Sequence, residues 1–181
     1  MLANMAGLEN FYKLIIKKIK TKNMTHQIIN LLTLLILGIL YMYTFAMVQN
    51  KFFSKLTSPK NPAVLILYVA AIASASINLI HIADISSDAL LFFLDQGNFF
   101  KGILYSVAFF IGMWLFSLAF FRTSFFIVGL LSPENEMDEL IKNNKEIAWI
   151  HAIIVITISF VIAPAIVKIA SSFIPYPKLP F

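Results

Sequence analysis

Four apolar runs, each long enough to cross a lipid bilayer, constrain this chain more than any other feature. A helix that crosses the hydrocarbon core needs about 20 mostly apolar residues. The 181 residues are 60% hydrophobic and 13% charged, which excludes an ordinary water-soluble domain of this length. We therefore predict an all-α, polytopic membrane protein with four transmembrane helices in an up-down-up-down bundle. The predicted spans are Ile28–Val48, Ala63–Asp84, Phe99–Phe121 and Ile147–Ile174.

Two shorter segments flank this predicted membrane domain of residues 28–174. Residues 1–27 form a basic amino-terminal segment with an apolar face, which predicts an amphipathic helix at the membrane surface. The alternative is a basic flank that only orients the first span. Residues 175–181 contain three prolines and predict an extended, Pro-rich tail. The candidate residues for binding the membrane surface or a partner are Lys13, Lys17, Lys18, Lys20 and Lys22.

A stripe of polar side chains follows one face of the second span. Ser74, Asn78, His81, Asp84 and Asp88 are three or four residues apart, which places them on one helical face. A charged group near the middle of a bilayer costs roughly 3 kcal/mol on insertion scales, so this face should meet other helices or water. The alternative is that the last three residues mark the exit of the helix into water, and only the first two lie within the membrane.

Small residues on the second span predict that it packs closely against its neighbours. Ala71 and Ala75 have the small-xxx-small spacing that lets two helix backbones approach, and Ala70 and Ser74 lie beside them. We therefore expect the second span to be an internal helix.

The third apolar run is longer than a bilayer requires. From Phe99 to Leu131 a helix would rise about 50 Å, against a hydrocarbon core of about 30 Å. We expect Arg122 at the interface, with residues 123–131 along the surface or in a tilted extension. Before this run, residues 86–101 predict a short interfacial helix or re-entrant turn.

Residues 132–146 are the most polar stretch. The start Ser132-Pro133-Glu134 is typical of a helix amino terminus. Apolar and charged side chains alternate after it with helical spacing. The stretch therefore predicts a short amphipathic lead-in helix that continues directly into the fourth span.

The predicted topology brings charged residues to similar depths. The lysine cluster near the amino terminus favours a cytoplasmic location for both termini. On that side Lys168 should pair with Asp84 or Asp88, and on the other side Arg122 should pair with Glu146. Either pair could be structural or part of a mechanism. The ion-pair candidates are Lys168, Arg122, Glu146 and His151.

The chemistry-bearing residues do not converge on a catalytic site. The three histidines fall in separate regions, and the chain has no cysteine. It also lacks an H-E-x-x-H motif, a G-x-S-x-G motif and a glycine-rich phosphate loop. We therefore expect no enzyme, no catalytic residue, no metal site and no cofactor.

Two classes of function remain. The first is a non-enzymatic integral membrane subunit, an anchor, sensor or scaffold of a larger assembly in bacterial defence, secretion or envelope function. Its expected partners are the lipid bilayer, further copies of the chain and other protein subunits, but no nucleic acid. Its expected location is the bacterial inner membrane. The alternative is an oligomeric ion channel or small transporter whose pore is lined by the polar stripe.

Two short motifs resemble a known family. Asp95-Gln96-Gly97-Asn98 opens the third span, and Lys142-Asn143-Asn144 opens the fourth. They are similar to the span openings of the DUF350 family, bacterial inner-membrane proteins of unknown function with duplicated two-helix units. The resemblance covers the last half of the chain and departs from the family in one respect, since a single span separates the two motifs. It implies no activity and no site residue.

Overall fold

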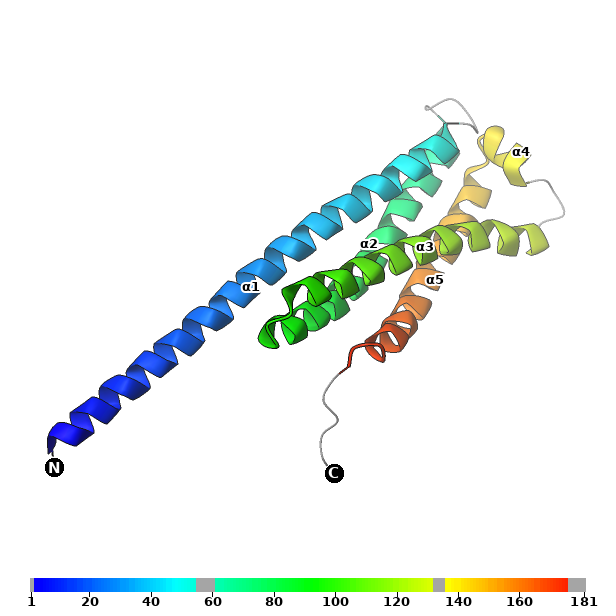
Figure 1. The fold of residues 1–181 in the computed structure, drawn as a ribbon. Coiled ribbons are helices and arrows are strands. Elements are labelled where there is room, and N and C mark those ends of the chain that lie inside the picture. Colours follow the sequence, from blue (N-terminus) through cyan, green and yellow to red (C-terminus); the bar gives the residue numbers. More distant parts are fainter. Residues whose placement is uncertain (1, 55–60, 132–135, 176–181) are drawn as a thin grey trace.

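The computed structural model describes residues 2–54, 61–131 and 136–175, with side chains for residues 24–54, 61–130 and 137–175. The described residues form five helices and no strand (Figure 1). All of these helices except α4 are long and apolar enough to cross a membrane. The prediction of an all-helical chain with four membrane-length helices is confirmed. The helices are α1 (Leu2–Phe53), α2 (Pro62–Asp95), α3 (Phe99–Leu131), α4 (Glu136–Ile141) and α5 (Lys145–Ser171).

Helix α2 is the central helix. It packs against α1, α3 and α5, antiparallel to the first two and parallel to the third (Figure 1). The alanines that the sequence marked as small packing residues are buried, with Ala70, Ala71 and Ala75 at most 3% exposed. Small side chains let the neighbouring backbones approach, which explains how one helix contacts three others.

Helices α2 and α3 approach each other closely near their connecting turn. A Cβ atom placed on Gly102 would lie 2.9 Å from Cδ1 of Leu90 and 3.3 Å from Cα of Leu90. Only glycine fits this contact without a shift of the neighbouring helix. The backbone carbonyl of Gly102 also accepts a hydrogen bond from the Ser106 hydroxyl, at 3.0 Å.

The two motifs that resemble the family form equivalent turns. Gly97 after α2 and Asn143 after α4 both have a positive φ, 74° and 66°. In each turn the next residue donates a backbone hydrogen bond across the helix end, from Asn98 to Phe93 and from Asn144 to Glu139. This is the Schellman arrangement, in which a left-handed residue satisfies the last carbonyls of a helix.

Helices α2 and α5 begin in the same way. The Asn61 side chain accepts hydrogen bonds from the backbone N–H groups of Ala63 and Val64. The Asn144 side chain likewise accepts from Glu146 and Ile147. Each asparagine therefore satisfies two of the N–H groups that an α-helix leaves without an internal partner.

Several predicted boundaries differ from the structure. Helix α2 continues to Asp95, so residues 86–95 are not a separate interfacial helix. The reason is that Ile85, Ala89, Leu90 and Phe93 remain buried and keep this part packed in the bundle. Helix α3 runs without a break past Arg122, as in the tilted extension that the sequence allowed.

The polar lead-in also differs from the prediction. Helix α4 ends at Ile141 and does not continue into α5, because Asn143 adopts a left-handed conformation between them. Helix α5 ends at Ser171, three residues before the predicted end of the fourth span. Residues 132–135 of the lead-in and 176–181 of the tail lie outside the described residues.

Helix α1 extends well beyond the bundle. Its 52 residues would rise about 78 Å, more than twice the thickness of a hydrocarbon core. The membrane-length part is Met24–Phe53, and the preceding residues continue the same helix past the turn between α2 and α3 (Figure 1). The amino-terminal segment is thus helical but not separate from the first span. The side chains of Lys13, Lys17, Lys18, Lys20 and Lys22 lie outside the described ones.

Candidate functional site

The first two residues of the polar stripe, Ser74 and Asn78, are buried and take part in hydrogen bonds that connect all four membrane-length helices. Ser74 on α2 shares a hydrogen bond with Ser159 on α5. Asn78 on α2 donates to the Ser117 hydroxyl on α3 at 2.7 Å, and that hydroxyl lies 2.6 Å from the Tyr41 hydroxyl on α1. All five residues are at most 4% exposed. We call these five residues the polar seam.

The polar seam is uncharged and nearly saturated with hydrogen bonds. Ser117 also donates to the backbone carbonyl of Met113 at 2.9 Å. Among the described residues, the amide oxygen of Asn78 has no hydrogen-bond partner. A buried hydroxyl or amide is costly unless it is paired, so these contacts specify which helices meet at this level.

The other half of the stripe has different surroundings. His81 is half-buried, whereas Asp84 and Asp88 are exposed. The face predicted from spacing is therefore real, but only its first half lies inside the bundle.

Neither of the two predicted ion pairs, Lys168 with Asp84 or Asp88 and Arg122 with Glu146, forms among the described residues. Lys168 and Glu146 are exposed, and neither forms an ion pair with a described residue. The Arg122 guanidinium lies over the Phe52 ring, 4.3 Å from its centroid. His151 is buried, with its ring centroid 4.4 Å from that of Phe125. The structure thus brings two of the four candidates against aromatic rings.

Two contacts that sequence reasoning missed hold α1 to the far end of α2. Asn30 donates to the Ser87 hydroxyl at 2.7 Å, and Nδ1 of His26 lies 3.1 Å from a carboxylate oxygen of Asp95. The available signal was Asn30 itself, an amide within an apolar run. Such a residue usually hydrogen-bonds across a helix interface.

At the opposite end of the bundle, hydrogen bonds join the start of α2 to the end of α4 and to the turn that precedes α5. The Asn61 amide donates to the backbone carbonyl of Leu140 at 2.8 Å, and the Ala63 N–H donates to the Asn143 side chain at 3.1 Å. Nearby, Glu139 accepts hydrogen bonds from Lys142 and Asn144, which lower the pKa of its carboxyl below the usual value.

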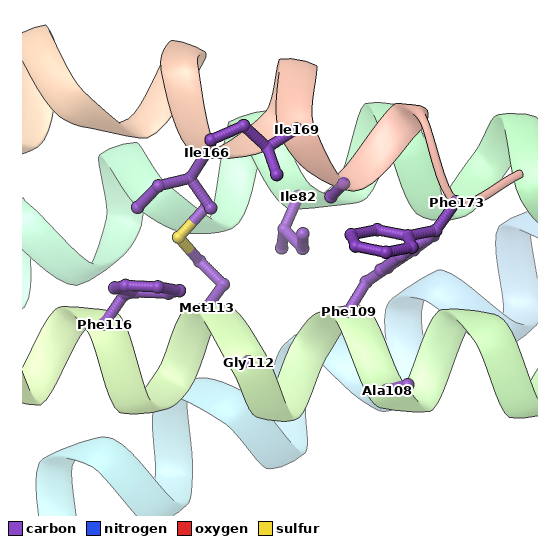
Figure 2. Close-up of a pocket in the computed structure, with 10 residues that line it drawn as sticks. Ile82, Ala108, Phe109, Gly112, Met113, Phe116, Ile166, Ile169 and Phe173 are labelled. Atoms are coloured by element: carbon purple, nitrogen blue, oxygen red, sulfur yellow. The ribbon is translucent and has the colours of Figure 1, made fainter.

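An apolar crevice of about 200 Å³ lies between α3 and α5. Figure 2 shows Met113 and Phe109 of α3 facing Ile166 of α5 and Phe173, which follows the end of α5, with Ile82 of α2 at the back. These side chains suit a hydrocarbon chain. Within the described residues, no three His, Cys, Asp or Glu side chains are grouped so that they could hold a metal ion.

The fold and the polar seam define a class of protein, an all-helical protein with four membrane-length helices tied together by buried uncharged groups. The chain belongs to the family described as Domain of Unknown Function (DUF350), whose sequence pattern matches residues 23–170. The match confirms the resemblance and extends it from the last half of the chain to all four membrane-length helices. No match was found among curated proteins or among solved structures.

Proposed function

We propose that this chain is a non-enzymatic subunit of a larger membrane-associated assembly, an anchor, sensor or scaffold for other proteins. It crosses the bacterial inner membrane in an up-down-up-down order with both termini in the cytoplasm. It acts with further copies of itself or with other subunits, and it takes part in defence, secretion or envelope function.

The polar seam is the observation that supports this proposal most strongly. Ser74, Asn78 and Ser117 are buried by neighbouring helices of the same chain and hydrogen-bonded to them. A pore-lining or catalytic group must instead remain accessible to an ion or a substrate. The use of these groups in helix packing therefore favours a structural membrane subunit.

The long amino-terminal extension of α1 supports the same proposal. Helix α1 continues past the turn between α2 and α3, and the sequence of this extension contains five lysines. A basic helix next to a membrane can bind an acidic protein surface or anionic lipid. We assign the extension the role of docking a partner subunit.

Cross-linking in native membranes, followed by native mass measurement in detergent, tests this function. We expect a stoichiometric second polypeptide with the natural chain. Replacement of Lys13, Lys17, Lys18 and Lys20 by glutamine should remove it. The matched control replaces Lys51, Lys55 and Lys60, which lie between the first two spans at the other end of the predicted bundle.

Two results would contradict the proposal. One is a natural chain that carries no second polypeptide in native membranes. The other is ion conduction by the reconstituted chain alone that is lost on Asp84→Asn, which would favour the oligomeric channel instead.

A further inference from the structure

Arg122 interrupts an apolar face of α3. It is the only arginine of the chain, and it is exposed. Ile111 and Leu115 precede it on the same helical face and are each 56% exposed, while Phe126 follows and is 68% exposed. On a membrane-length helix, a face of this kind meets lipid. A cation on this face must find an anion or water.

The guanidinium group is held in place by an aromatic ring. Its Cζ atom lies 4.3 Å from the centroid of the Phe52 ring on α1. That ring contacts the rings of Phe121 and Phe125 edge-on, with centroids 5.8 and 6.0 Å away. A guanidinium stacked on a ring keeps its N–H donors at its edge. No carboxylate or carbonyl of the described residues accepts from them.

The position of Arg122 along α3 matches the edge of a hydrocarbon core. Lys101 lies on the same face of α3, is exposed, and rests over the Phe93 ring. The helix rises about 30 Å from Lys101 to Arg122, which is the thickness of a typical hydrocarbon core. The two cations are therefore separated along α3 by about the thickness of a hydrocarbon core, as groups at its two edges would be.

We propose that Arg122 binds the phosphate of a phospholipid whose acyl chain lies along the exposed face of α3 next to Leu115. The phosphate supplies the negative charge for the Arg122 guanidinium, which no carboxylate of the described residues provides. A phosphate also accepts two parallel N–H bonds from a guanidinium, a geometry that a lysine cannot offer. The site fixes the depth of α3 and orders one lipid in the layer next to the protein.

The single arginine allows a direct test. Protein grown with arginine labelled with ¹³C at Cζ gives one guanidinium signal, and its dipolar coupling to ³¹P is measured by solid-state NMR in phospholipid bilayers. We expect dephasing that corresponds to a carbon–phosphorus separation of roughly 4 Å, since charge-assisted N–H···O bonds are about 2.8 Å long. No dephasing in phospholipid bilayers would overturn the proposal.

A second arm separates a lipid phosphate from a free one. The same labelled protein is placed in galactolipid bilayers, which contain no phosphate, and inorganic phosphate is added. We expect no dephasing there. Equal dephasing with inorganic phosphate would show a soluble-anion site and would overturn the assignment to a lipid.

A third arm tests the ring that supports the guanidinium. Phe52→Leu keeps the arginine and its label but removes the stacking surface, so we expect weaker dephasing in phospholipid bilayers. The matched control is Phe116→Leu, the same change at an exposed ring on α3, which should leave the dephasing unchanged. Equal dephasing in both variants would overturn the role of Phe52.

Discussion

The two halves of the polar stripe on α2 share a helical face but have different neighbours. Ser74 and Asn78 are buried and bonded to α5 and α3, whereas Asp84 and Asp88 are exposed. Helix α5 runs parallel to α2, and the Ser74–Ser159 contact places its last residue, Ser171, level with Ser86, between Asp84 and Asp88. Spacing therefore determines which side chains share a face, and the contacts with neighbouring helices at each level determine which of them are covered.

A charge placed in the buried half should have the largest effect. Asn78→Asp puts a carboxylate among neutral groups in the interior of the bundle, where we expect a loss of roughly 3 kcal/mol. The matched change in the exposed half, Asp88→Asn, should alter stability by less than about 0.5 kcal/mol. The free energy of unfolding in detergent micelles measures both. Similar unfolding midpoints would show that the two halves are equally solvated.

A methyl group added between α2 and α3 should have the next largest effect. Gly102→Ala places a Cβ against Leu90, whereas Gly112 has no atom within 4 Å of such a Cβ. Both changes gain about the same helix propensity, so their difference isolates the packing cost. We expect Gly102→Ala to be less stable than Gly112→Ala by about 1–3 kcal/mol in thermal unfolding. Equal stabilities would mean that α2 and α3 are loosely packed at the contact between Leu90 and Gly102.

The hydrogen bond between α2 and α5 should contribute less. A double-mutant cycle of Ser74→Ala and Ser159→Ala should give a coupling energy of about 0.6 kcal/mol, the usual value for interhelical hydrogen bonds in membranes. The control cycle combines Ser76→Ala with Ser159→Ala. The Ser76 hydroxyl donates to the carbonyl of Ile72 on its own helix. The control should show no coupling to Ser159. A coupling as large as in the first cycle would point to a general effect of alanine on α2.

The membrane-length helices could be predicted from the sequence because they depend on hydropathy summed over many residues. Length and hydropathy over 20 or more residues identify a span whatever its neighbours are. The end of α2 was different, since the sequence predicted a separate interfacial helix or re-entrant turn over residues 86–101. Helix α2 instead stays packed in the bundle there, and Ser87 accepts a hydrogen bond from Asn30 on α1.

Contacts between helices were harder to predict than the helices themselves. The predicted neighbour of Arg122 was Glu146, whereas the structure places Phe52 of α1 beside it. The order of the spans predicts which residues lie at the same depth in the bundle. The rotation of each helix about its own axis then determines which of those residues touch. Asn143 is a missed local signal, because an asparagine next to a helix end often adopts the left-handed conformation that stops the helix.

The turn between α4 and α5 should show the smallest effect, because its polar contacts are exposed to solvent. Hydrogen bonds from Lys142, at 2.8 Å, and Asn144, at 3.1 Å, lower the pKa of the Glu139 carboxyl below its usual value. A lowered carboxyl pKa stabilises the folded turn above the pKa of the unfolded chain. That contribution disappears as the pH falls through the folded pKa.

The carboxyl ¹³C shift of Glu139, followed as the pH is lowered, measures this directly. Lys142→Gln removes the larger of the two causes, so the Glu139 pKa should rise toward its usual value. Lys145→Gln removes a neighbouring charge that makes no hydrogen bond to Glu139, and its titration curve should match that of the natural chain. If the Lys142→Gln curve also coincides with the natural one, the exposed contact seen at this turn does not persist in solution. The contrast with the buried polar seam would then be sharper, because hydrogen bonds would order the chain only where neighbouring helices exclude water.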